Sequence, residues 1–203
     1  TSYAMWVRLA KKFEKFADDL EPRQAHLASD LCLLAANIWQ REVDRDDLAM
    51  KLYTRAYHFD PESLDALQGA RFIYEDHKDW QLALQLCTFE QELLDEPREK
   101  ATLFLHMAEI CAQHLDLRDD AVRCVKEALK LMPDAEPPQQ YQDIILEVET
   151  EHKERFDQCL LEAEASKTPR QKARRYHEAA EVLLGVDPQD ERIEQLLKDS
   201  LEL

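Results

Sequence analysis

The chain has 203 residues, 45% of them hydrophobic and 34% charged, and its 43 acidic against 26 basic residues give a formal net charge of −17. Because phosphate backbones and anionic lipids repel so negative a chain, nucleic-acid binding and generic membrane binding are poor expectations. The two glycines are too few for glycine-rich phosphate loops, dinucleotide-binding turns or tight-hairpin β folds. The composition favours helices and names no activity.

Helices are expected where an apolar pattern of helical period runs between breaks, and no segment shows a convincing strand period. The predicted helices cover residues 3–20, 23–43, 45–59, 62–77, 79–95, 97–115, 117–131, 138–166, 169–184 and 188–202. Pro61, Pro97, Pro133 and Pro169 mark four of the breaks and recur every 36 residues. A fixed period of this size is typical of repeat arrays. Near the end of the chain, Asp187 is the expected N-cap before Pro188, and Gly185 is expected to follow the preceding helix.

Three stretches repeat one arrangement of small and bulky residues over paired helices. The first reads Cys32-x2-Ala35-Ala36-x2-Trp39, then Ala49-x3-Tyr53-x2-Ala56-x4-Pro61. The second reads Leu67-x2-Ala70-Arg71-x2-Tyr74, then Ala83-x3-Cys87. The third reads Phe104-x2-Met107-Ala108-x2-Cys111, then Ala121-x3-Val125-x2-Ala128-x4-Pro133. Small residues allow two helices to approach closely, so each stretch predicts a packed hairpin of antiparallel helices.

This arrangement resembles the tetratricopeptide repeat (TPR) family, and the resemblance covers residues 30–133. The chain departs from the family pattern in three ways. It lacks the glycine after the Leu position, Glu90 replaces the second small residue of the second stretch, and the first and third stretches hold one extra residue between their helices. The resemblance implies an all-α, right-handed solenoid of helix hairpins with a protein-binding role, similar to TPR arrays of bacterial scaffold proteins. An irregular helical bundle is the alternative.

Four segments follow from the repeats and from the patterns at the two ends. They are an N-terminal helix or cap (1–22), three TPR-like repeats (23–136), a degenerate fourth pair with one long helix (137–185) and a capping helix (186–203). Solenoid ends need a polar outer face, which the last helix offers. The first helix is expected to cap the array or to pack against further segments, since a chain that opens at Thr1 is expected to be a piece of a longer protein.

The sequence offers little for catalysis or metal binding. Five cysteines without a CxxC pair predict reduced thiols and a cytoplasmic location. Cys111-x2-His114 and Glu149-x2-His152 each supply two ligands, fewer than a zinc or di-iron site requires. The chain has no Gly-x-Ser-x-Gly motif and no apolar run long enough to span a bilayer. We therefore expect no enzyme, no cofactor and no membrane insertion; the alternative is a metal or thiol enzyme that uses the helix pair 138–184.

The resemblance implies a ligand groove formed by the first helix of each repeat. Its expected lining residues are Leu33, Asn37, Gln40, Arg41, Gln68, Phe72, Glu75, Leu105, His106, Glu109 and Gln113. Some family members clamp the terminal carboxylate of a chaperone with Lys and Asn residues. Here Asn37 matches one clamp position, whereas Leu33, Gly69, Thr102 and His106 stand at the others. The mixed apolar and polar surface favours an amphipathic helix or an extended segment instead.

Charge adds a preference for the partner. Residues 62–97 contain nine acidic against two basic residues, which favours a partner with basic side chains. The basic cluster Lys167, Arg170, Lys172, Arg174 and Arg175 follows an acidic stretch, 139–165. A charge match within this helix pair is the simpler interpretation, and an acidic patch on a partner is the alternative. Self-association through an exposed end of the array is the alternative to binding another protein.

Overall fold

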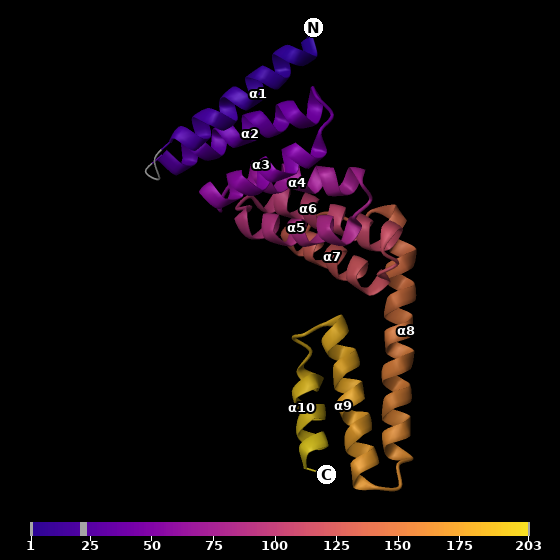
Figure 1. The fold of residues 1–203 in the computed structure, drawn as a ribbon. Helices are drawn as coiled ribbons and strands as arrows, with labels where there is room; N and C mark the ends of the chain where they lie inside the picture. Colours follow the sequence, from indigo (N-terminus) through magenta and orange to yellow (C-terminus); the bar gives the residue numbers. More distant parts are fainter. Residues whose placement is uncertain (1, 21–23, 203) are drawn as a thin grey trace. The chain divides into compact units, whose positions relative to one another are not determined.

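The computed structural model describes residues 2–20 and 24–202, and these residues form helices and no strand (Figure 1). The predicted all-α class is therefore confirmed. The chain divides into two compact units, Thr1–Leu103 and Phe104–Leu203, and the division falls within α6 (Pro97–Glu109). The boundary falls inside the segment 23–136 that is expected to contain the three repeats. The expected start of the second helix, at residue 23, lies outside the described residues.

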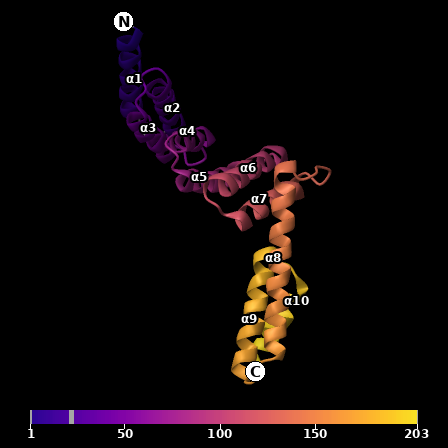
Figure 2. The same cartoon turned by 90° about the vertical axis from the view of Figure 1, so that its right-hand side faces the viewer.

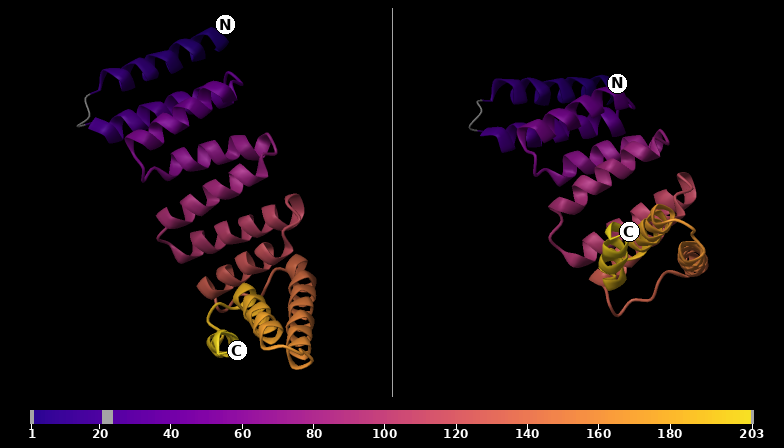
Figure 3. Two further views of the ribbon diagram at one scale, coloured as in Figure 1. Left: turned by 60° about the horizontal axis from the view of Figure 1, so that its bottom comes forward. Right: turned by 90° about the horizontal axis from the view of Figure 1, so that it is seen from below.

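Unit 1 is a succession of helices in which each packs against the next (Figure 3, left). They are α1 (Ser2–Asp19), α2 (Ala25–Arg41), α3 (Asp46–Phe59), α4 (Leu64–Asp76) and α5 (Trp80–Leu93), followed by the first part of α6. Alanines fill the closest approaches: Ala35 and Ala36 on α2 and Ala49 and Ala56 on α3 are fully buried. Trp39 packs beside them and donates from Nε1 to Glu14 Oε1 of α1 at 2.6 Å. The small residues allow close helix packing, and the larger ones fill the space beside them.

The C-terminal part of unit 2 is an antiparallel bundle of three helices. Its elements after α6 are the π-helix η2 (Ile110–His114), α7 (Arg118–Leu131), α8 (Gln139–Glu164), α9 (Pro169–Val186) and α10 (Glu191–Leu201). Figures 1 and 2 show α8 and α9 side by side, and α9 also packs against α10. Ala180 of α9 is fully buried between larger apolar residues, including Phe156 of α8 and Ile193 of α10.

Three turns within the hairpins share one conformation. Asp44, Lys78 and Asp116 each have a positive φ (58°, 63° and 54°). The N–H of the following residue returns to a helix carbonyl at 2.8 Å in all three. This is the left-handed ending that commonly closes helices, here achieved without glycine. Each turn therefore reverses the chain tightly enough for the next helix to pack antiparallel.

The extra residue expected in the first and third stretches takes two different forms. In both stretches the N–H that closes the turn reaches back six residues, from Arg45 to Trp39 and from Leu117 to Cys111, whereas the N–H of Asp79 reaches back five to Tyr74. In the first stretch the helix stays α-helical to Arg41, and the extra residue lies in the turn. In the third stretch the helix widens into η2, where the N–H of Leu115 bonds to the carbonyl of Ile110. A π-helix accommodates one inserted residue without ending the helix.

The expected helix boundaries are met within a few residues except before the last helix. Gly185 lies inside α9, and the N–H of Asp187 bonds to the carbonyl of Leu183 and so ends that helix. Asp187 Oδ1 accepts from the N–H of Gln189 at 3.0 Å, which forms a turn rather than a helix start. The N-cap is Asp190, whose side chain accepts from the N–H of Arg192 at 2.9 Å. Asp187 as N-cap was therefore wrong, because the turn around Pro188 delays α10 by three residues.

Candidate functional site

A groove of about 530 Å³ lies in unit 1 across α2, α3 and α4. Six of the eleven residues expected to contact a ligand line this groove. They are Leu33, Asn37, Gln40 and Arg41 from α2 and Gln68 and Phe72 from α4, joined by Tyr53, Asp65, Gly69 and Asp76. The groove is therefore formed by the first helices of two successive hairpins, with one residue from between them.

Tyr53 forms the floor of the groove and fixes its amide side chains. Its hydroxyl donates to Gln40 Oε1 at 2.8 Å and lies 3.4 Å from Asn37 Oδ1. The Asn37 amide nitrogen donates in turn to the carbonyl of Leu33 at 2.9 Å. Burial raises the pKa of Tyr53, so the phenol remains protonated and acts as a donor. The repeat pattern predicts only that the bulky Tyr53 ring packs between helices. It carries no information on the hydrogen-bond partners of the hydroxyl group.

Gly69 makes room for the Tyr53 ring. A Cβ atom added at Gly69 would lie 2.2 Å from Cε1 of Tyr53, well inside contact distance. A glycine within a helix usually costs stability relative to alanine. Its presence in α4 follows from the close approach of the Tyr53 ring rather than from any special backbone angle, since no glycine has a positive φ. The position that was compared with a clamp Asn therefore has a steric role.

A buried ion pair supports the α4 side of the groove. Arg71 Nε donates to Glu90 Oε1 of α5 at 2.6 Å, and its NH1 donates to Glu75 Oε1 at 2.7 Å. The exposed fractions of Arg71 and Glu90 are only 8% and 1%. The Arg71 guanidinium also lies 4.8 Å from the ring centroid of Phe72. The ion pair therefore holds beside the groove an aromatic ring that is itself 48% exposed.

The surroundings of the Glu90 carboxyl and of the Arg71 guanidinium shift the pKa of each group by several opposing effects. Burial raises the pKa of Glu90, while hydrogen bonds from Arg71 and Gln68 act in the opposite direction. Burial alone would lower the pKa of Arg71, but its bonds to Glu90 and Glu75 raise it overall. With the guanidinium charged and 2.6 Å from Glu90, we take the carboxylate as ionised. Gln68 thus belongs to both the groove and the ion-pair network.

The remaining predicted contact residues divide between the units. Glu75 belongs to unit 1 but is engaged with Arg71 and is not among the groove lining. Leu105 and His106, on α6, are half-buried, whereas Glu109 and Gln113 are exposed. These last four belong to unit 2. The candidate site is accordingly defined by unit 1 alone.

A second, smaller pocket of about 200 Å³ lies over α3, α4 and α5. Its lining is mostly apolar and includes Met50, Tyr57, Leu86 and Phe89. Phe89 is 50% exposed, close to the value for Phe72. Phe72 and Phe89 are therefore nearly equally exposed and lie at two different surfaces of the same unit, so that each can serve as the control for the other in mutagenesis.

The described residues give no support for metal chemistry. Within them, no three His, Cys, Asp or Glu side chains gather in a way that could hold a metal ion. Cys111 is buried and His114 is exposed, so this pair divides between core and surface. His152 Nε2 lies 3.1 Å from Asp119 Oδ1 on α7.

All five cysteines are free thiols. Burial raises the pKa of Cys32 and Cys159, and raises that of Cys87 to about 12. The exception is Cys111, whose pKa is lowered by a hydrogen bond with Cys124. Because Cys111 is only 1% exposed, a substrate would have to displace the core to reach it.

The basic cluster of α9 finds partners inside unit 2. Arg175 lies 2.9 Å from Glu162 of α8 and also bonds to Glu178 of its own helix, which Arg174 contacts too. Lys172 lies over the ring of Tyr176, with 5.6 Å to the centroid. The expected charge match between α8 and α9 is thus made by Arg175, while Arg174 and Lys172 contact side chains of α9 itself.

Comparison with protein-family models finds none that matches this chain, and comparison with curated proteins finds no match either. Among the described residues, no helix has both the length and the apolar character that a membrane crossing requires. The functional argument therefore rests on the groove and on the surfaces around it.

Proposed function

We propose that this chain is a non-enzymatic, TPR-like interaction module that binds a peptide or helix of a partner protein in the α2–α4 groove. The observation that supports this most directly is the groove itself, in which the exposed Phe72 and the half-buried Leu33 stand beside amides held in place by Tyr53. Such a combination suits a segment that buries side chains and also forms hydrogen bonds. Five free thiols favour a reducing, cytoplasmic environment.

The groove also indicates the chemistry of its ligand. Leu33 and Phe72 offer an apolar contact, and Phe72 is supported from behind by the Arg71 guanidinium. Asp65 and Asp76 outnumber Arg41 among the charged lining residues. We infer that the ligand places an apolar side chain against Phe72 and a lysine or arginine toward the acidic residues of α4.

The test uses the matched phenylalanines. Peptides selected on the wild-type protein from a random display library are synthesised, and their affinities are measured by fluorescence anisotropy for wild type, Phe72→Ala and Phe89→Ala. Loss of an aromatic anchor at a binding surface is expected to weaken binding about tenfold or more. The proposal predicts that loss for Phe72→Ala and little change for Phe89→Ala, with enrichment of lysine or arginine in the selected peptides.

Two results would contradict the proposal. Loss of binding with Phe89→Ala alone would move the site to the α3–α5 pocket. Equal affinities for all three proteins would place binding outside both surfaces. Circular dichroism of the two variants controls for unfolding, since both rings are about half exposed and their removal leaves the core intact.

A further inference from the structure

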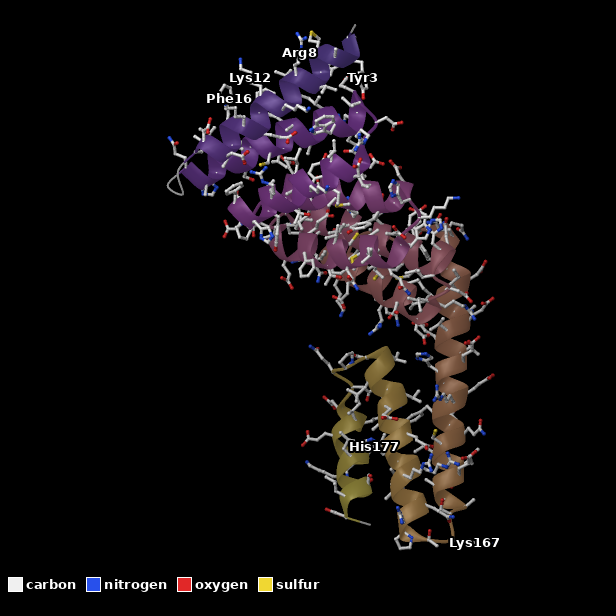
Figure 4. The ribbon with its side chains drawn as sticks, viewed as in Figure 1. Tyr3, Arg8, Lys12, Phe16, Lys167 and His177 are labelled. Atoms are coloured by element: carbon white, nitrogen blue, oxygen red, sulfur yellow. The ribbon has the colours of Figure 1, made fainter. Side chains whose placement is uncertain are left out.

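The outward side of α1 has an apolar row that no described helix covers. Met5 and Phe16 are 56% and 45% exposed, and Leu9 between them is half-buried. In Figure 4, Arg8, Lys12 and Phe16 point away from α2, the only helix in substantial contact with α1 among the described residues. The opposite side of α1 is buried through Ala10 and Ala17. The helix therefore has a second surface with the spacing of a helix-packing face.

This second surface is cationic, unlike the rest of its unit. Residues 2–19, which form α1, contain four basic and three acidic residues, whereas residues 24–103 contain eight basic and sixteen acidic residues. The four cations are Arg8, Lys11, Lys12 and Lys15, and all are exposed. Within the described chain none of them forms an ion pair; Lys12 instead lies 5.6 Å from the centroid of the Phe16 ring.

The fold itself leaves these cations unneutralised. Glu14, the acid among them in sequence, turns inward and accepts from Trp39 Nε1 at 2.6 Å. Asp18, one turn further, pairs with Arg55 of α3. Two of the three acids of α1 are thus engaged with α2 and α3, and the third, Asp19, is exposed at the C-terminal end of the helix. Positive charge therefore remains along the outward edge of the apolar row.

We propose that the α1 outer face, defined as Met5, Arg8, Leu9, Lys12, Lys15 and Phe16, is a docking surface for an acidic amphipathic helix of a partner protein. A helix whose apolar stripe is flanked by Asp and Glu would cover the exposed row and pair with the cations on either side. The 18 residues of α1 offer roughly 27 Å of contact length. This surface is separate from the α2–α4 groove and does not depend on the function proposed for it.

The charge distribution favours a protein helix over an anionic membrane. A membrane is a plane that would also meet the rest of unit 1, where residues 24–103 contain sixteen acidic against eight basic residues. A single helix contacts α1 locally and avoids that repulsion. The same argument disfavours a second copy of the chain unless an acidic helix face of that copy is presented.

The probe is a synthetic helical peptide of about the length of α1, with one leucine stripe flanked by glutamates and a fluorescent label. Its counterpart has lysine in place of each glutamate. Anisotropy is measured with wild-type protein, with Arg8→Glu/Lys12→Glu, and with Lys51→Glu/Arg98→Glu as the control. The control makes the same charge change at exposed positions elsewhere in unit 1.

The glutamate peptide is expected to bind wild type saturably, more weakly at higher salt, and at least about tenfold more weakly to Arg8→Glu/Lys12→Glu. The control should stay within about twofold, and the lysine peptide should prefer the α1 variant to wild type. Phe16→Ser should weaken binding at all salt concentrations, because it removes apolar contact.

Three results would overturn the proposal. If the α1 variant and the control weakened peptide binding equally, binding would depend on the overall charge of the protein and not on the α1 outer face. No binding of the glutamate peptide, combined with binding of phosphatidylserine vesicles that Arg8→Glu/Lys12→Glu abolishes, would assign the surface to membranes. A dimer seen by analytical ultracentrifugation and lost in that variant would assign it to a second copy. The two peptides on wild-type protein decide the matter even if a variant fails to fold.

Discussion

The hairpins α2–α3 and α4–α5 differ in the kind of residue that occupies two corresponding buried positions. Ala56 in the first hairpin and Glu90 in the second stand 34 residues apart at corresponding positions, and Ala36 corresponds to Arg71. The first hairpin uses two fully buried alanines. The second uses a guanidinium and a carboxylate 2.6 Å apart. The corresponding positions are therefore occupied by two small residues in one hairpin and by one complementary charged pair in the other.

The difference has a consequence for the groove. The alanines of α2–α3 contribute only packing, whereas Arg71 also supports Phe72 and Gln68 also contacts Glu90. In the second hairpin, the buried ion pair therefore also contacts two residues that line the groove. The four predictions below begin with the buried pair, which tests that difference directly, and continue to the glycines and the turns.

The largest effect is expected from splitting the ion pair. Arg71→Ala leaves Glu90 buried without its cation, and Glu90→Ala removes the buried carboxylate that pairs with the Arg71 guanidinium. Removing one partner of a buried pair typically costs about 3–5 kcal/mol of unfolding free energy. The double variant, which recreates the two alanines of α2–α3, should cost less than the sum of the single changes. Urea unfolding followed by circular dichroism measures all three, and strict additivity would contradict the coupling.

The pH dependence of Arg71→Ala sharpens this test. Burial raises the pKa of Glu90, and losing Arg71 removes a group that lowers it. The folded variant then binds a proton more tightly than the unfolded chain, so its stability is greatest below the ordinary Glu pKa and falls as pH rises through the raised value. We expect the deficit relative to wild type to be smaller near pH 4 than near pH 8. A deficit independent of pH would show that Glu90 is not the cause.

Replacing each of the two glycines by alanine is expected to change the stability by an intermediate amount, with opposite sign at the two positions. Gly69→Ala would place its Cβ 2.2 Å from Tyr53 Cε1, displace the ring and cost about 1–3 kcal/mol. Gly185→Ala in α9 meets nothing within 4 Å and should stabilise the chain by up to about 1 kcal/mol through helix propensity. Thermal unfolding measures both. Adding Tyr53→Val to Gly69→Ala should recover part of the loss, and a stabilising Gly69→Ala would refute the steric role.

The smallest effect is expected at the turns. Lys78 has a φ of 63° without glycine, and Lys78→Gly should stabilise the second hairpin by roughly 0.5–1 kcal/mol. Asp44 and Asp116 have similar angles, but aspartate tolerates this conformation better than lysine. Asp44→Gly and Asp116→Gly should therefore gain less. Equal gains at all three positions in thermal unfolding would show that residue type does not matter there.

Much of the helical framework was predictable, because it depends on local spacing. Alanines 49, 83 and 121, chosen from the repeat pattern, are all fully buried. The turn residues were less accessible, since nothing in Lys78 itself signals a positive φ. The start of α10 was misplaced because Asp187 and Asp190 both have side chains that can cap, and only the turn around Pro188 selects between them.

The groove was predictable in part. Six of its lining residues followed from the repeat register, whereas Tyr53 was assigned to the core and Gly69 was compared only with a clamp position. Both omissions have one cause. The ring of Tyr53 passes under Gly69 from another helix, and a pattern within one helix carries no information about such an approach.

By itself, the sequence determined the helical class, the approximate helix boundaries and the small residues on which the hairpins close, because a helical period and residue volume are local properties. Only the tertiary structure decided that Arg71 meets Glu90, 19 residues away, that one inserted residue becomes a turn and another a π-helix, and that Glu14 of α1 turns inward. These outcomes depend on which side chains of separate helices meet. The same packing that engages Glu14 with Trp39 and Asp18 with Arg55 leaves the α1 lysines exposed.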